Sequence, residues 1–279
     1  MNFFKTAILL GALSAVLLIG GEMLAGPQGL QMALFGAVFM NGLAYFFSDK
    51  IALAMSGARA VTREQAPRLF GITERLCGKA GLPLPKLYVI PEQAPNAFAT
   101  GRSPRHASVA VTAGLLELMS EDEVEGVIAH ELAHVKNYDI LTASVAATIA
   151  AAITFLSRMA LFFGGGSRDD NRGGHPIAAL AMLFLAPFAA VILQLWISRT
   201  REFAADATAA KIVGHPYGLV KALEKLGYYN KKLPMDVAPA TASLFIVAPL
   251  SGQSFFEWFS THPPLEKRIA ALRDMSVTP

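Results

Sequence analysis

Residues 127–135 read V-I-A-H-E-L-A-H-V and contain the pattern H-E-x-x-H. His130 and His134 are four residues apart, so on a helix both imidazoles leave the same face one turn apart. This spacing lets two neutral ring nitrogens bind one Zn²⁺ at about 2.0–2.1 Å each. Glu131 follows the first histidine and is placed to take a proton from a metal-bound water. The alternative is two hydrogen-bonded histidines on an ordinary helix; we favour the metal site.

The residues before this pattern are typical of a helix start. Ser120 is a suitable N-cap, and the carboxylates of residues 121–123 favour the positive end of a helix. An apolar face at helical spacing follows, formed by Val124, Val127, Ile128 and Leu132. We therefore expect the H-E-x-x-H pattern on a helix that begins after Ser120.

The composition indicates an integral membrane protein. The chain of 279 residues is 53% hydrophobic and 16% charged, with a mean hydropathy of +0.43, whereas about 25% of residues are charged in an average protein. The net charge of +3 and the lack of Lys/Arg runs argue against a nucleic-acid partner. One cysteine, Cys77, cannot form an internal disulfide, which fits a reducing compartment.

Four apolar blocks predict four transmembrane helices embedded in a lipid bilayer. They cover residues 3–21, 29–47, 141–163 and 176–197. The first can nearly cross about 30 Å of hydrocarbon, with Lys5 reaching the interface, and the third and fourth are long enough to span it. A cleaved signal peptide is the alternative for the first block. For the third and fourth, the alternative is a helical hairpin packed on the soluble domain.

The distribution of basic residues predicts the orientation. Residues 22–31, which include the connection between the first two blocks, contain no Lys or Arg, whereas Lys50, Arg59, Arg63 and Arg68 follow the second block. The positive-inside rule therefore places the N-terminus and the chain from about residue 50 in the cytoplasm. We expect a multi-pass protein whose active site faces the cytoplasm.

The domain organisation follows from these blocks. The prediction is two transmembrane helices in residues 1–50, a first part of a catalytic domain in 51–140, a membrane hairpin in 141–197 and a second catalytic part in 198–279. The fold class is mainly α. The part of the chain that carries the H-E-x-x-H helix is expected to be an α+β domain of the zincin type with a small β-sheet, gluzincin-like if a glutamate supplies the third ligand.

Short alternating stretches predict the strands of that sheet at residues 86–90, 96–101 and 107–112. An edge strand beside the zinc helix can pair with an extended substrate backbone, which makes Asn96, Ala97 and Phe98 candidates for substrate binding. A plain structural hairpin is the alternative. Helices are expected at residues 62–81 and from 217 to 227, and a last helix opens at residues 261–266 with a proline in its first position.

A catalytic zinc usually has three protein ligands, so one is missing from the pattern. The downstream candidates are His175, Glu202, Asp206, His215 and His262. Glu202 and Asp206 are four apart and face the same way on a helix, so one can ligate while the other accepts a hydrogen bond from a ligating histidine. We choose Glu202 as the ligand and Asp206 as its supporting carboxylate. The alternative is a surface pair beside Arg199 and Arg201.

Four motifs together resemble one family. They are H-E-L-A-H at 130–134, R-E-F-A-A-D at 201–206, N-A-F-A-T-G at 96–101 and T-H-P-P at 261–264. They look like the HtpX heat-shock metalloproteases, bacterial inner-membrane enzymes related to the membrane proteases that trim prenylated CAAX proteins. The resemblance implies that His130, His134 and Glu202 bind zinc and that Glu131 is the catalytic base. It also implies quality control of damaged membrane proteins alongside a membrane AAA protease.

The expected function is that of a zinc metalloendopeptidase with one Zn²⁺ per chain. His262 and Arg199 are candidates for stabilising the oxyanion. At 1.5 Å per helical residue, the ligands lie roughly 10–15 Å from the membrane surface, so the expected substrates are membrane proteins or unfolded chains near the bilayer. The alternatives are an intramembrane protease, which the charged flanks of the zinc helix disfavour, and a chaperone or adaptor with a structural zinc.

Overall fold

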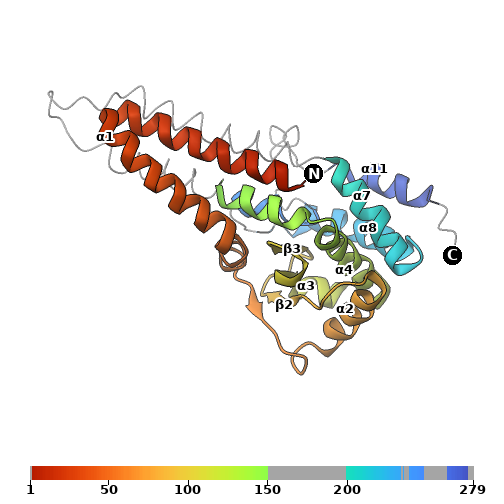
Figure 1. Ribbon diagram of the computed structural model, residues 1–279. Helices are drawn as coiled ribbons and strands as arrows, with labels where there is room; N and C mark the ends of the chain where they lie inside the picture. Colours follow the sequence, from red (N-terminus) through yellow and green to blue (C-terminus); the bar gives the residue numbers. More distant parts are fainter. Residues whose placement is uncertain (1, 150–198, 234, 236–238, 248–262, 276–279) are drawn as a thin grey trace.

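The computed structural model describes residues 2–149, 199–233, 235, 239–247 and 263–275. The helices are α1 (Asn2–Met55), α2 (Pro67–Ala80), α3 (Ala113–Leu118), α4 (Glu121–Lys136), α7 (Arg199–Val213), α8 (Tyr217–Lys232), α9 (Pro239–Ala242) and α11 (Leu265–Arg273). A further apolar helix is described from Asp139 to Ile149. The mainly α fold class with a small sheet is confirmed (Figure 1).

Helix α1 folds back on itself and extends away from the rest of the molecule (Figure 1). The reversal lies at Gly26, whose φ of +57° suits glycine, followed by Pro27 inside the helix. Asn41 Nδ2 donates to Ser14 Oγ at 2.8 Å, so the two arms of α1 are antiparallel neighbours. This matches the two apolar blocks predicted before residue 50.

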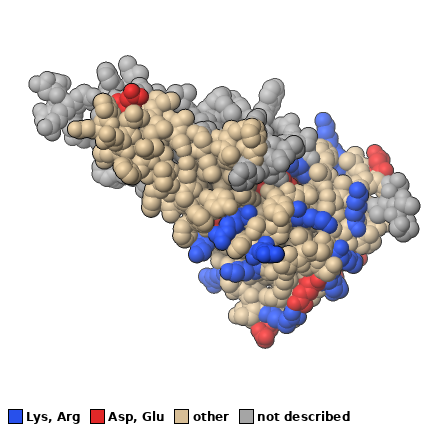
Figure 2. Space-filling view, in the orientation of Figure 1, with Lys and Arg blue, Asp and Glu red and all other residues tan. Residues whose placement is uncertain are grey.

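The second arm of α1 has the character of a membrane helix. Residues Gly26–Met55 are long and apolar enough to cross a membrane. Large apolar side chains on it are exposed, among them Met32, Phe35 and Phe39. Charged residues gather instead over the other end of the molecule (Figure 2). Among the described residues this is the one candidate span; the third block is described only to residue 149, and the fourth lies outside the described residues.

The sheet has four strands in the order β1-β2-β4-β3. They are β1 (Arg59–Ala60), β2 (Lys86–Ile90), β3 (Ala97–Gly101) and β4 (Ala107–Thr112). Strands β2 and β4 are parallel, and the β1–β2 and β4–β3 pairs are antiparallel. The three predicted strands are confirmed, and β3 lies at an edge of the sheet beside α4.

Helix α4 is the centre of the soluble domain, and its start follows the prediction. Ser120 Oγ accepts from Glu123 N, and the Glu123 carboxylate accepts from Ser120 N, which completes a capping box. The helix packs against α2, α7, α8 and the sheet. At Gly126 a Cβ atom would lie 2.5 Å from Leu219 N, so glycine is what lets the α8 backbone come this close.

Three predicted helix boundaries are wrong. Helix α2 begins at Pro67 rather than at residue 62. A proline disfavours helical backbone angles at the residue before it, and Ala66 accordingly has φ −138° and ψ 59°. Helix α8 continues through Gly227 to Lys232. The last helix begins at Leu265, with Pro264 as its N-cap residue rather than its first helical residue. The division into domains at residues 50, 140 and 197 stays a prediction.

Candidate metal centre

Helix α4 presents both histidines of the H-E-x-x-H pattern to the same space. His130 is fully buried and His134 is partly buried. Their Nε2 atoms lie 3.1 Å apart, and the rings meet edge to face with centroids 4.7 Å apart. One helical turn separates them in sequence, which brings both Nε2 atoms to one point.

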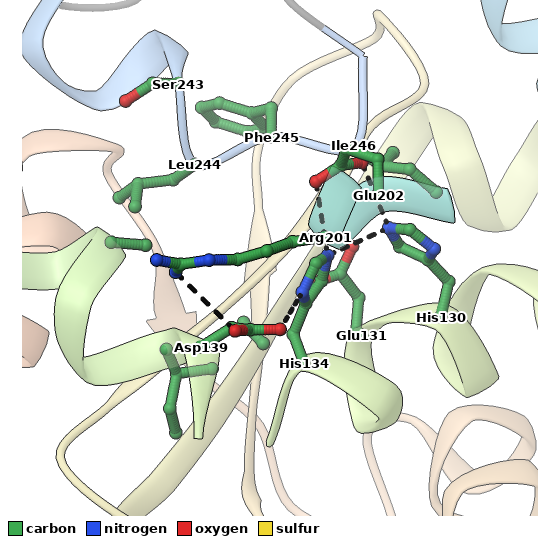
Figure 3. Close-up of a pocket in the computed structure, with 13 residues that line it drawn as sticks. His130, Glu131, His134, Asp139, Arg201, Glu202, Ser243, Leu244, Phe245 and Ile246 are labelled. Carbon is green, nitrogen blue, oxygen red and sulfur yellow. Dashed lines mark hydrogen bonds and ion pairs between the residues drawn. The ribbon is translucent and has the colours of Figure 1, made fainter. Parts of the chain in front are cut away.

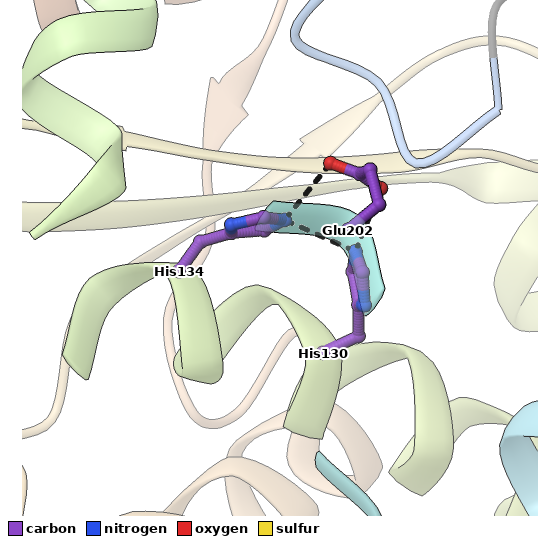
Figure 4. Close-up of side chains that lie close together, drawn as sticks. All are labelled: His130, His134 and Glu202. Atoms are coloured by element: carbon purple, nitrogen blue, oxygen red, sulfur yellow. Dashed lines mark hydrogen bonds and ion pairs between the residues drawn. The ribbon is translucent and has the colours of Figure 1, made fainter. Parts of the chain in front are cut away.

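Glu202 reaches the same point from α7 (Figure 4). Its Oε2 lies 3.6 Å from His130 Nε2, and its Oε1 lies 3.4 Å from His134 Nε2. All three side chains offer ligand atoms within 4.8 Å of one another. A tetrahedral ion with bonds of about 2.0–2.1 Å needs ligand atoms about 3.3 Å apart. The three side chains therefore fit a small divalent cation without rearrangement.

Each histidine has a carboxylate behind it. Asp206, one turn beyond Glu202 on α7, places Oδ1 2.9 Å from His130 Nδ1. Asp139, just after α4, places Oδ2 3.2 Å from His134 Nδ1. A carboxylate that accepts the Nδ1–H fixes the tautomer in which Nε2 is free to ligate. The two carboxylates thus orient both rings so that each Nε2 atom points toward the metal site.

The electrostatics of the three side chains favour a cation. Burial alone would lower the pKa of His134, but Asp139 and Glu202 outweigh it and raise that pKa to about 10. Burial lowers the pKa of His130, although Asp206 acts in the opposite direction. Carboxylates thus hold a proton on His134 strongly, and a divalent ion at the same point replaces that proton's charge.

Glu131 lies beside this cluster in the pocket (Figure 3). Its side chain is buried, and burial raises its pKa to about 7; Ala99 N on strand β3 donates to the carboxylate and lowers the pKa in part. Its other oxygen, Oε1, is buried and has no hydrogen-bond partner among the residues that the structure describes. Such a carboxylate can accept a proton near neutral pH and pass it on.

Arg268 of α11 also belongs to the site, and the sequence reasoning missed it. It is fully buried; its Nε and Nη2 donate to both oxygens of Asp206 at 2.8 and 2.7 Å, and its Nη1 lies 3.1 Å from Glu202 Oε2. These carboxylates keep its pKa raised against the effect of burial. One signal was present: Arg268 stands on the apolar stripe of the last helix, between Leu265 and Leu272.

Asp139 and Arg201 were missed as well. Asp139 Oδ1 lies 3.5 Å from Arg201 Nη1, while its Oδ2 holds the ring of His134. Burial lowers the pKa of Arg201. No sequence pattern links these residues, because Asp139 follows α4 and Arg201 lies on α7, 62 residues later.

The residues predicted to bind substrate, at the start of β3 and just before it, hold another segment of the chain. Asn96 Nδ2 donates to Val247 O at 2.8 Å, and Ala97 O accepts from Ile246 N at 2.9 Å. The rings of Phe98 and Phe245 pack edge to face, with centroids 5.0 Å apart. Residues 243–246 line the pocket opposite α4 (Figure 3). Part of the β3 edge is therefore paired within the chain.

The other sequence candidates lie elsewhere. His215 stacks on Tyr217 at the start of α8, beyond the end of α7, and does not line the pocket. His175 and His262 lie outside the described residues, as does the side chain of Arg199. The residues that the structure brings together at the pocket are His130, Glu131, His134 and Glu202, backed by Asp139, Asp206 and Arg268.

The fold and the site define a metallopeptidase of the zincin type, with two helical histidines, an adjacent glutamate and a third ligand, a glutamate, from a later helix. The model of peptidase family M48 matches residues 63–276, and the chain belongs to that family, among the HtpX proteases. A protease HtpX homolog from Desulfatibacillum aliphaticivorans is 54% identical over 275 residues, covering 97% of this chain and 89% of the relative. Another from Thermodesulfovibrio yellowstonii is 51% identical over 279 residues, covering 99% of both.

A solved structure shares the fold. The crystal structure of S. mikatae Ste24p matches with a TM-score of 0.55 at 23% identity. The match covers 97% of this chain, which spans 65% of the length of that protein. The family, the HtpX homologs and the apolar helix together support a membrane metalloprotease.

Proposed function

We propose that the protein is a zinc-dependent endopeptidase of the bacterial inner membrane, which cleaves damaged or misfolded membrane proteins at the cytoplasmic face. One observation carries the proposal: Nε2 of two helical histidines and the carboxylate of Glu202 converge on one point beside the buried carboxylate of Glu131. His130, His134 and Glu202 would hold one ion per chain. A zinc ion there would supply a Lewis acid for a peptide carbonyl and lower the pKa of a nearby water.

The proton transfers and the orientation of the ligands fall to side chains of the protein. Glu131 takes the proton of the attacking water and later gives it to the leaving amine, and a pKa of about 7 suits both transfers. Asp206 and Asp139 keep the two histidine rings in the ligating tautomer. Water adds to the peptide bond, and the products are a carboxylate and an amine.

The membrane assignment rests on α1 and on the charges that follow it. The exposed apolar side chains of its second arm fit a lipid environment, and Lys50, Arg59, Arg63 and Arg68 follow that arm. Substrates are then membrane proteins or unfolded chains near the bilayer. A functional link to a membrane AAA protease is proposed from the family resemblance. A reporter that fluoresces only in the cytoplasm, fused after residue 279, tests the orientation; a dark fusion protein would contradict it.

The central test compares the wild-type protein with Glu131→Gln, both purified in detergent. We expect both to bind one zinc by elemental analysis, and only the wild type to cut β-casein, with the activity lost to a chelator and restored by Zn²⁺. Equal cleavage by both proteins would refute the role of Glu131. A zinc-loaded wild type that binds casein without cutting it would instead support an adaptor with a structural zinc.

A further inference from the structure

Arg201 is a buried cation that the proposed catalytic steps do not use. Its side chain is only 10% exposed, and it crosses the pocket between Leu244 and Asp139 (Figure 3). Both terminal nitrogens, Nη1 and Nη2, are buried and have no hydrogen-bond acceptor within the described part of the chain. The neighbouring carboxylate, Asp139 Oδ1, is 3.5 Å away and is an ion-pair partner only.

The second buried arginine of the site provides the contrast. Arg268 donates to Asp206 through two nitrogens and to Ile246 O at 3.0 Å, so its guanidinium is satisfied by the chain. A guanidinium has five N–H donors and no acceptor, and leaving such donors buried and unused is unfavourable. The geometry at Arg201 therefore fits a donor group that completes its hydrogen bonds with an oxygen brought by a ligand.

The charges of the pocket decide which oxygen this is. Asp139 already compensates the charge of Arg201, and Glu131 and Glu202 line the same pocket. Asp206, paired with Arg268, is the fourth carboxylate of the site. With a divalent ion bound, the four positive charges of the ion, Arg201 and Arg268 balance the four negative charges of these carboxylates. A ligand carboxylate would add an uncompensated charge in a largely buried space, whereas a neutral carbonyl oxygen would not.

We propose that Arg201 donates hydrogen bonds to a backbone carbonyl oxygen of the bound substrate, within two residues of the bond that is cut. The proposal rests on the peptidase function proposed above. Asp139 holds the guanidinium on one side and the ring of His134 on the other, so the substrate carbonyl is fixed relative to the metal ligands. Because the contact is to the backbone, Arg201 aids binding without selecting a side chain.

The test uses the full-length protein in detergent and labelled ten-residue β-casein peptides around a bond that the wild type cuts. Binding is measured by fluorescence anisotropy in Glu131→Gln protein, which leaves the peptide intact, with and without Arg201→Met or Arg201→Lys. Each backbone carbonyl near the bond is replaced in turn by a thioamide, a poorer acceptor. Arg75→Met, which removes an exposed arginine of α2, is the matched control.

We expect Arg201→Met to weaken binding of the unmodified peptide roughly 10- to 100-fold, and Arg201→Lys to weaken it less. One thioamide position should weaken binding when Arg201 is present and have no effect in Arg201→Met. Zinc content should stay at one per chain in every variant.

Three results would overturn the role of Arg201 while leaving the peptidase intact. They are unchanged binding in Arg201→Met, a loss confined to peptides with Asp or Glu near the bond, and a loss of zinc that accounts for the loss of binding. If the zinc-loaded wild type cuts no peptide, the proposed function itself fails, and the role of Arg201 with it.

Discussion

Replacing Arg268 by methionine should strongly destabilise the soluble domain. The change removes two hydrogen bonds to Asp206, at 2.8 and 2.7 Å, one to Ile246 O, at 3.0 Å, and the contact of 3.1 Å to Glu202. Two buried carboxylates then lose their shared cation. Breaking a buried ion pair by removing one partner costs about 3–5 kcal/mol.

The free-energy change can be converted into a melting temperature. For a domain of about 150–250 residues, 1 kcal/mol corresponds to roughly 2–4 °C, so we expect Arg268→Met to lower the melting temperature by about 6–20 °C. Arg268→Lys should have a smaller effect, because lysine keeps the charge but cannot bind both oxygens of Asp206 in a planar fork. Added Zn²⁺ should reduce the difference between variant and wild type, since the ion then gives Glu202 the positive partner that Arg268 no longer provides.

The assay can use the one cysteine of the chain. Cys77 is only 4% exposed and belongs to the core that contains α4, so a thiol-reactive dye reports unfolding of the soluble domain. The matched control is Arg273→Met on the same helix, where an exposed arginine pairs with exposed Glu224 and contributes about 1 kcal/mol or less. Equal melting temperatures for the Arg268→Met and Arg273→Met proteins would refute the argument from buried charge.

Three further outcomes are expected. Gly126→Ala places a Cβ 2.5 Å from Leu219 N and should lower the free energy of unfolding by about 1–3 kcal/mol in the same thiol assay. Gly78→Ala, in open space on α2, should raise it by up to about 1 kcal/mol. The opposite order of stabilities would contradict the close helix contact at Gly126. Asp139→Asn should weaken zinc binding about 10- to 100-fold in competition with a chromophoric chelator, because the carboxylate no longer orients its histidine; unchanged affinity would contradict that role. Although burial opposes it, hydrogen bonds from Lys225 of α8 and from the N-cap residue Ser120 lower the pKa of Glu123. Its stabilisation is therefore present above the unfolded-state pKa and is lost as pH falls through the lowered folded-state pKa, so Glu123→Gln should be less stable than wild type at pH 7 and similar to it only below that folded-state pKa.

Local features of the sequence predicted the elements that carry the ligands. The capping box at Ser120, the four-residue spacing of the histidines and the alternation of the short strands each involve residues that are close in sequence. Such patterns reflect backbone geometry and depend little on the rest of the fold. The same reasoning was wrong at Gly227, which ends no helix. A Cβ there would lie 2.8 Å from Leu265 Cδ1, so Gly227 lies against α11, a partner far away in the sequence.

The missed residues are those whose roles depend on long-range contacts. Arg268 meets Asp206 across 62 residues, and Asp139 meets Arg201 across the same separation. A charged residue carries no local mark of burial, since its partner is supplied by another element. An arginine on the apolar stripe of a helix is the exception, because that position predicts burial and a buried arginine requires a carboxylate.

The two arginines show how one pocket can use the same side chain in opposite ways. Arg268 donates its hydrogen bonds to Asp206 and Ile246 O, and so links α11 to α7 and to residues 243–246, which line the pocket. The two terminal nitrogens of Arg201, beside the metal ligands, donate no hydrogen bond within the described part of the chain. A buried cation that is fully hydrogen-bonded stabilises the site, whereas one that is only ion-paired keeps capacity for a ligand. Loss of Arg268 should therefore act on stability, and loss of Arg201 on substrate binding.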